Sequence, residues 1–115
     1  MLTTVPGVPS AALPPAGQRF LREFGSETDL PTSPGTPEAA QATEVLLDAI
    51  ARSDGTRASV VEELFATEVE NGILGSFSFD RLGDIDPAPV GVYRFEDGKI
   101  VVDGLVRAPL DASNG

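Results

Sequence analysis

The stretch at residues 75–84, "GSFSFDRLGD", carries the strongest local pattern in the chain. Phe77 and Phe79 stand two residues apart, so in a β-strand both rings lie on one face, where core packing explains them better than stacking on a ligand. Asp80, Gly83 and Asp84 follow directly, and these residue types favour a tight turn. The stretch therefore predicts a strand over about residues 74–79 that ends in a turn.

Working upstream, the pattern predicts two helices before this strand. Thr36 can cap a helix, Pro37 suits the first helical position and Glu38 complements the helix dipole, so we expect a helix over about residues 37–53. Its apolar residues recur at spacings of three and four and predict one buried face: Ala39, Ala42, Val45, Leu46, Ala49 and Ile50. A second helix is expected over about residues 57–69, closed by "ENG" at residues 70–72.

Working downstream, β-branched and aromatic residues predict strands over about residues 90–95 and 99–103. Asp97-Gly98 lies between them and favours a type I′ hairpin turn. The first 36 residues are rich in proline and glycine and are typical of a connecting segment, with a short helix expected over about residues 15–24, ended by Gly25. The expected organisation is one domain over residues 1–115: the connecting segment and short helix over 1–36, a helix pair and strand over 37–80, a turn over 81–89, and a closing hairpin over 90–105.

Composition excludes several classes of function. A chain of 115 residues with 41% hydrophobic residues can build one small core. The formal net charge of -10 repels a phosphate backbone, so we expect no nucleic-acid partner. The sequence has no histidine and no cysteine, and therefore offers no zinc site, no Ser-His-Asp unit and no sign of a cofactor. We find no signal peptide and no membrane-spanning stretch, so the chain as written would be cytoplasmic.

The carboxylates near the turn allow two functional interpretations, and neither is favoured. A calcium loop needs oxygen ligands at alternate positions, and Asp80 and Asp84 fit that pattern whereas Leu82 and Ile85 do not. An enzyme could use Asp80, Asp84 or Glu70 as acid or base, but no nucleophile, imidazole or metal set accompanies them. We therefore expect no metal, no catalytic residue and no enzyme.

The order of these elements resembles the C-terminal part of the type I periplasmic solute-binding proteins, particularly the branched-chain amino acid binding group of ABC transporters. The stretch from "AAQATEVLLDAIARSDG" through "GILGSFSFDRLGD" looks like that family's two late helices, glycine-led strand and turn. "PAPVGVYRFEDGKIVV" looks like its last strands, and "TTVPGVP" followed by "AGQRFLREFG" is similar to its crossover segment and the next helix. The sequence departs from the family where an aromatic-aspartate pair is usual in the long helix, because Thr43-Glu44 stands there.

The resemblance implies an α/β fold, the C-terminal fragment of a Rossmann-like protein with two lobes. Intact family members are about three times as long and hold the ligand mainly with their N-terminal two-thirds, so only Thr3 and Thr4 are candidate ligand-binding residues here. The resemblance also implies that residues 80–89 belong to a hinge between the lobes, with Asp80, Gly83, Asp84, Pro87 and Pro89 as its turn residues. In a fragment we expect unpaired edges of a parallel sheet and exposed surfaces at Phe77, Phe79, Val92 and Tyr93.

The function implied is a truncated, non-enzymatic solute-binding module of an ABC transport system. Its parent would lie in the cell envelope, as a periplasmic protein or an extracellular lipoprotein. That parent would bind an amino acid or analogue between two lobes and deliver it to an ABC permease. One alternative is the ligand-sensing domain of a regulator or receptor, and another is a self-sufficient acidic α+β interaction protein. A dimer, or a partner that supplies the missing lobes, would cover the exposed surfaces.

Overall fold

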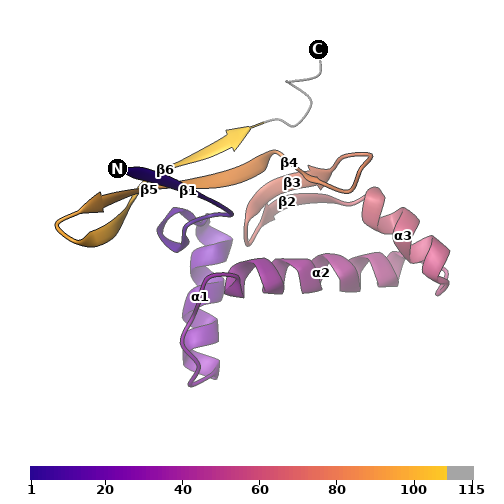
Figure 1. The fold of residues 1–115 in the computed structure, drawn as a ribbon. Coiled ribbons are helices and arrows are strands. Elements are labelled where there is room, and N and C mark those ends of the chain that lie inside the picture. The colour runs from indigo at the N-terminus through magenta and orange to yellow at the C-terminus, as the bar shows by residue number, and fades with distance from the viewer. Residues whose placement is uncertain (109–115) are drawn as a thin grey trace, which may run out of the picture.

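A computed structural model describes residues 1–108 of the chain, and residues 109–115 of the expected domain lie outside the described part (Figure 1). In chain order the elements are β1 (Leu2–Pro6), the short 3-10 helix η1 (Ser10–Ala12), α1 (Pro15–Glu27), α2 (Thr36–Arg52), α3 (Arg57–Phe65), β2 (Glu68–Gly72), β3 (Gly75–Phe79), β4 (Ile85–Asp86), β5 (Ala88–Glu96) and β6 (Lys99–Ala108). Within the described residues, no helix combines the length and the apolar character that crossing a bilayer requires.

The strands form two separate three-stranded sheets. One has the order β1-β5-β6 and the other the order β2-β3-β4, and all four pairings are antiparallel. The expectation of parallel strands is therefore wrong for the described residues, because short turns join β2 to β3 and β5 to β6, and such turns reverse the chain direction. The mixed α/β fold itself agrees with the sequence prediction.

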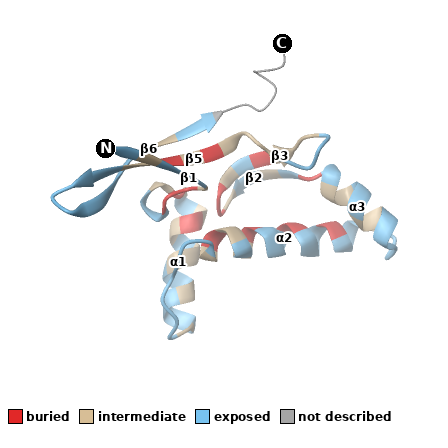
Figure 2. Ribbon diagram, viewed as in Figure 1, coloured by how far each residue is buried: buried red, intermediate tan, exposed pale blue. Residues whose placement is uncertain are grey.

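Helix α2 runs beneath the β2-β3-β4 sheet, and α1 packs across the N-terminal end of α2 (Figure 1). The buried residues of α2 are spaced four apart: Pro37, Gln41, Val45 and Ala49 (Figure 2). The apolar stripe predicted from the sequence was too wide, because Leu46 is 44% exposed and Ile50 is 47% exposed. Only one edge of that stripe meets the sheet, and the other edge faces open space among the described residues.

The core is small for a chain of this length. It contains Val8, Leu13, Val45, Ile73, Leu74 and Phe77. The accessible surface is 7806 Å², whereas a compact monomer of this mass exposes about 6000 Å². The radius of gyration is 16.1 Å, against about 13 Å for a compact domain of similar length. The molecule is therefore less compact than a typical domain of its length, and many of its large apolar side chains are exposed.

Two helix ends differ from the prediction. Helix α1 continues through Gly25 to Glu27, and Thr28 ends it by donating both its amide and its hydroxyl to the Phe24 carbonyl, at 3.0 and 2.8 Å. The second predicted helix was too long: α3 ends at Phe65, and the segment Glu68–Gly72 is strand β2. Pairing with β3 outweighs the local helical pattern of that segment, because Val69 lies opposite Phe77 and Glu68 opposite Ser78.

The strands are where the pattern places them, with different lengths. Strand β3 begins at Gly75, one residue later than predicted, whereas β5 and β6 both run further than predicted, to Glu96 and Ala108. Residues Asp97 and Gly98 have φ angles of 51° and 75°, as a type I′ turn requires. Strand β4 was not predicted. It lies inside the segment 81–89 that was expected to be a turn, and its two residues pair with Ser78 and Phe79 of β3.

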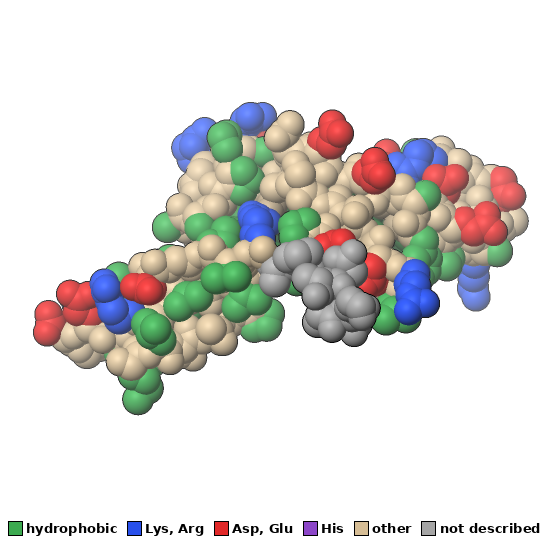
Figure 3. Space-filling view, turned by 90° about the horizontal axis from the view of Figure 1, so that it is seen from above, with side chains coloured by type: hydrophobic (Ala, Val, Ile, Leu, Met, Phe, Trp, Pro, Cys, Tyr) green, Lys and Arg blue, Asp and Glu red, His purple; other side chains and the backbone are tan. Residues whose placement is uncertain are grey.

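The expected exposed surface is also wrong in its details. Phe77 is buried, and Phe79, Val92 and Tyr93 are half-buried. The rings of Phe77 and Phe79 share one face as predicted, with centroids 5.9 Å apart and an interplanar angle of 81°. Exposed apolar side chains gather instead on the β5–β6 hairpin, at the lower left of Figure 3, where they include Phe95, Ile100 and Val102.

Candidate hinge and adjoining cleft

Two segments of the chain run side by side between the β1-β5-β6 sheet and the part of the molecule that holds the helices and the β2-β3-β4 sheet. The first leaves β1 at Pro6 and reaches η1 through Gly7, and the second leads from β4 into β5 through Pro87. The Gly7 amide donates to the Pro89 carbonyl at 3.0 Å, and Pro6 lies opposite Val90 in the β1–β5 register. Two adjacent connections of this kind are the arrangement about which two parts of a protein can rotate.

A hydrogen-bonded turn precedes the second crossing. One carboxylate oxygen of Asp80 accepts hydrogen bonds from the amides of Leu82 and Asp84, at 2.8 and 2.9 Å. The Asp80 amide donates to the Asp84 carbonyl at 2.8 Å, and Gly83 has a φ of 88°, which favours glycine. The Asp80 side chain therefore holds the backbone of this turn together. Asp84, the other aspartate of the turn, contributes through its main-chain amide and carbonyl.

The prolines of the predicted hinge lie in the crossing itself. Pro87 is half-buried between β4 and β5, and Pro89 is buried near the start of β5. Proline fixes φ and donates no backbone hydrogen bond. The backbone of the crossing thus has little rotational freedom at these two prolines. Gly83, earlier in the same segment, is the residue whose backbone angles can change most easily.

An open cleft with a volume of about 320 Å³ adjoins the first crossing. Its walls come from the segment Val5–Ser10, the loop before α2, the first turn of α2, and Tyr93 of β5. The loop before α2 is ordered by Thr36, whose hydroxyl oxygen accepts a hydrogen bond from the Ser33 amide at 3.1 Å. The volume is at the lower end of the range for small-molecule sites.

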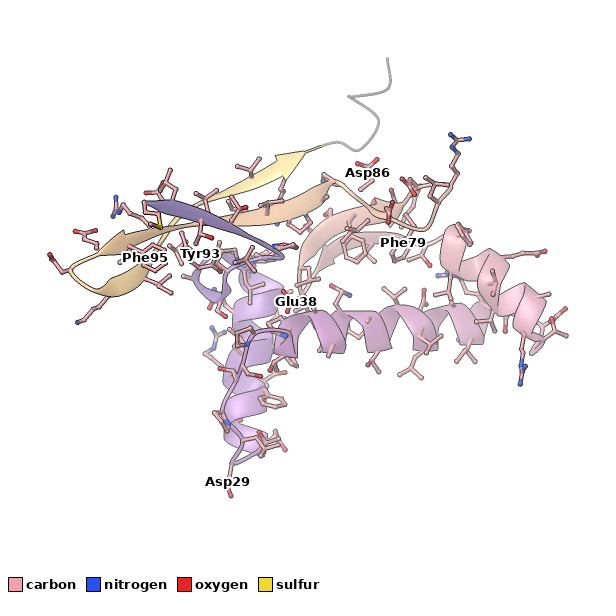
Figure 4. All side chains as sticks on the ribbon, in the orientation of Figure 1. Asp29, Glu38, Phe79, Asp86, Tyr93 and Phe95 are labelled. Atoms are coloured by element: carbon pink, nitrogen blue, oxygen red, sulfur yellow. The ribbon has the colours of Figure 1, made fainter. Side chains whose placement is uncertain are left out.

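Glu38 is the charged side chain of this cleft. It lies in the first turn of α2 beneath the crossing (Figure 4), and its Oε1 atom lies 3.2 Å from the position that a Cβ on Gly7 would take. Its Oε2 atom is buried and has no hydrogen-bond partner in residues 1–108. A buried carboxylate oxygen without a donor is costly and calls for an explanation. The sequence signalled Glu38 only as a partner of the helix dipole.

Gln41 is a buried polar residue that the sequence analysis did not single out. It is 3% exposed, and its Oε1 atom accepts a hydrogen bond from the Leu74 amide at 3.1 Å. The contact joins α2 to the turn between β2 and β3. A signal was present in the sequence, because Gln41 lies four residues from both Pro37 and Val45 and hence on the same helical face.

Thr3 and Thr4, the candidate ligand-binding residues, lie in β1. Thr3 is half-buried opposite Tyr93, and Thr4 is exposed opposite Val92. Neither residue lines the cleft, whose wall begins at Val5. The structure thus places Pro89 of the predicted hinge beside the first crossing, whereas Gly83 lies beside Phe65 of α3. The two threonines lie outside the cleft.

Two carboxylates of the described residues, those of Asp54 and Asp80, accept hydrogen bonds that order the local backbone. Residues 1–108 contain no group of three histidine, cysteine or acidic side chains placed to hold a metal ion. Hydrogen bonds from Thr56 and Ser59 hold the pKa of the exposed Asp54 carboxyl below its ordinary value, because they stabilise the charged form at the start of α3. Asp80 already accepts two backbone amides. These arrangements order turns and helix ends.

Comparison with known proteins relates this geometry to a fold. No family model matches the chain, and no curated protein matches it. Among solved structures, the leucine-binding protein LivK of Thermotoga maritima superposes with a TM-score of 0.73 and 26% sequence identity over 93% of this chain. The chain has the fold of part of a periplasmic solute-binding protein. It spans 31% of the length of the leucine-binding protein that it matches.

The small core and the large surface are consistent with a part of this fold. The match includes nearly all of the chain, so few of its elements lack a counterpart in the leucine-binding protein. The larger part of that protein has no counterpart here. The outer edge of α2 is among the exposed apolar surfaces, because Leu46 and Ile50 are both exposed there.

Proposed function

We propose that the chain is a non-enzymatic part of a solute-binding protein of an ABC-type transport system. The parent protein binds an amino acid or a close analogue between two lobes, in the cell envelope, and passes it to a permease. The observation that carries the proposal is the match to a leucine-binding protein along nearly the whole chain. The paired crossings at Gly7 and Pro89 support it, because closure of two lobes on a ligand needs such connections.

In this proposal the turn at Asp80 and the crossing through Pro87 and Pro89 form the hinge. The hydrogen bonds of Asp80 keep the end of β3 rigid, and Gly83 absorbs the change in backbone angles when the lobes move. Rotation about a short, well-defined segment lets each lobe move as a rigid body. In this proposal the residues that contact the ligand belong mainly to the rest of the parent, and Thr3 and Thr4 are the candidates within this chain.

A chimera tests the proposal. Residues 1–108 replace the matching segment of the Thermotoga maritima leucine-binding protein, and leucine binding is measured by isothermal titration calorimetry. We expect a folded chimera that binds leucine, because the ligand-contacting part comes from the parent and the graft supplies hinge and scaffold. The 115-residue chain alone is expected to show no leucine binding. A chimera that unfolds cooperatively, as a folded protein does, yet binds no leucine contradicts the proposal.

A second arm separates the hinge from the scaffold. Gly83 has a φ of 88°, so alanine at this position strains the backbone of the turn. Gly25 has no heavy atom within 4 Å of an added Cβ and lies inside α1, far along the chain from the hinge. We expect Gly83→Ala in the chimera to weaken leucine binding, and Gly25→Ala to leave it unchanged.

A further inference from the structure

A side chain forms a third connection between the two parts of the molecule, beside the two crossings. Arg107 lies in β6 opposite Pro89 of β5, and the Pro89 carbonyl accepts the Gly7 amide of the first crossing. From this position the Nη2 atom of Arg107 donates a hydrogen bond to the Leu74 carbonyl at 3.2 Å. Leu74 lies in the turn between β2 and β3, so the bond runs from the β1-β5-β6 sheet to the other part of the molecule.

The turn between β2 and β3 is shaped to receive a guanidinium group. A Cβ on Gly75 would lie 3.3 Å from Nη2 of Arg107 and 3.7 Å from both its Cζ and its Nη1, so the planar group lies against the glycine. Gly75 has a φ of 104°, a conformation that residues with a side chain rarely adopt. The turn is itself anchored on α2, because the Leu74 amide donates to Oε1 of Gln41 at 3.1 Å.

Another contact of β6 across the same boundary has a different physical character. Leu105 is a partly buried apolar side chain that packs against the core. Apolar contact is non-directional and tolerates sliding, whereas a hydrogen bond weakens steeply as its angle closes. The donor of Arg107 is also charged, which makes its bond stronger than one between neutral groups. Arg107 therefore distinguishes one orientation of the two parts from another, and Leu105 does not.

From these contacts we infer that Arg107 is a latch, which holds the β1-β5-β6 sheet and the part with the helices in the orientation that the structure shows. The two crossings permit rotation, and rotation moves β6 relative to the turn between β2 and β3. A rotation larger than the arginine side chain can follow breaks the hydrogen bond to the Leu74 carbonyl. The inference rests on the proposed function in taking the crossings as the axis of rotation, and it needs no ligand.

Distance measurements on the 115-residue chain test the latch. The sequence has no cysteine, so Leu47→Cys on α2 and Lys99→Cys on β6 place one nitroxide label on each part. Both side chains are exposed, and Lys99 begins β6 at the opposite end of the strand from Arg107. Double electron-electron resonance then gives the distribution of distances between the labels. We expect one narrow distribution, because the latch holds one orientation.

Substitutions of two arginines in the same sheet separate the latch from general effects. Arg107→Met keeps most of the length of the side chain and removes the donor. Arg94→Met makes the same change at an arginine whose ion pairs, with Glu96 and Asp103, stay within the sheet. We expect Arg107→Met to raise the fraction of label pairs outside the original distance peak at least about fivefold, as for loss of one net hydrogen bond. Arg94→Met should leave that fraction within about twofold of the original.

A conservative variant tests the chemistry of the contact. Arg107→Lys keeps a charged donor but has no planar group to lie against Gly75, so its distance distribution should be wider than the original and narrower than that of Arg107→Met. Circular dichroism checks that each variant keeps the helix content of the original chain.

Three results would overturn the inference: a broad distribution in the labelled original chain, an unchanged distribution in Arg107→Met, or equal broadening in Arg107→Met and Arg94→Met. Leucine binding has no part in this test, so any of these results refutes the latch and leaves the proposed function standing if the chimera binds leucine. A folded chimera that binds no leucine, together with a broadened distribution in Arg107→Met alone, refutes the proposed function and leaves the latch standing.

Discussion

The substitution Gly17→Ala tests how α1 is docked. Gly17 is buried in α1, where a Cβ would collide with the Ile73 carbonyl oxygen and approach the Leu13 Cβ to 2.8 Å. The Ile73 carbonyl belongs to the turn between β2 and β3 and cannot swing aside as the end of a flexible side chain can. The variant is therefore expected to push α1 away from this turn.

A matched substitution in the same helix isolates the size of this effect. Gly25→Ala adds the same methyl group where no heavy atom lies within 4 Å, and it should stabilise the protein by about 0.5–1 kcal/mol through helix propensity alone. Gly17→Ala has the same gain in propensity, but overpacking costs about 1–3 kcal/mol. Because the propensity cancels, the difference between the two variants measures the overpacking cost, about 1–3 kcal/mol.

Urea unfolding followed by far-UV circular dichroism measures both free energies of unfolding, and equal slopes with denaturant show that the unfolded states are comparable. We expect Gly25→Ala to be more stable than the original chain. Gly17→Ala should be no more stable than the original chain and clearly less stable than Gly25→Ala. If Gly17→Ala were as stable as Gly25→Ala, helix α1 would not pack against Ile73 in solution, and the reasoning would be refuted.

Three further substitutions each remove one hydrogen-bonding side chain. Gln41→Leu leaves the buried Leu74 amide without an acceptor and should cost about 1–3 kcal/mol in urea unfolding; an unchanged stability would contradict that role. Thr56→Ala removes the cap of α3, costs about 1 kcal/mol, and should raise the pKa of Asp54, as an NMR titration would show. Because the pKa of Asp54 is lowered on folding, its contribution is present above the ordinary aspartate pKa and is lost as the pH falls through the folded value, so the effect of Thr56→Ala should shrink in acid. Asp80→Ala removes an acceptor from two backbone amides and should cost about 1–2 kcal/mol and speed amide exchange in its turn; unchanged exchange would show that the turn does not depend on this carboxylate.

Local signals in the sequence were reliable where the structure depends on a few neighbouring residues. The start of α2 was predicted to within one residue because proline and an acidic side chain act within a single turn of helix. The hairpin at Asp97 and Gly98 was predicted because both residues accept positive φ angles, a property of the residues themselves. The shared face of Phe77 and Phe79 follows from the alternation of side chains along a strand.

Features that depend on distant contacts were not predictable in this way. Glu68–Gly72 reads locally as the end of a helix and becomes a strand only because β3 lies beside it. The outer edge of α2 reads as a buried stripe, since periodicity shows which residues share a face but not whether a partner covers it. Thr3 and Thr4 lie in strand β1, whereas the cleft next to that strand begins at Val5.

The sequence by itself determined the class of fold, the main helices, the closing hairpin and the turn after β3, because capping residues, glycines and apolar spacing act over a few residues. Tertiary structure alone decided that the strands pair antiparallel in two sheets and that Gly7 and Pro89 bring two crossings together. It also decided that a buried oxygen of Glu38 has no hydrogen-bond partner among residues 1–108. Those features arise from contacts between segments tens of residues apart, whose energies no local pattern records.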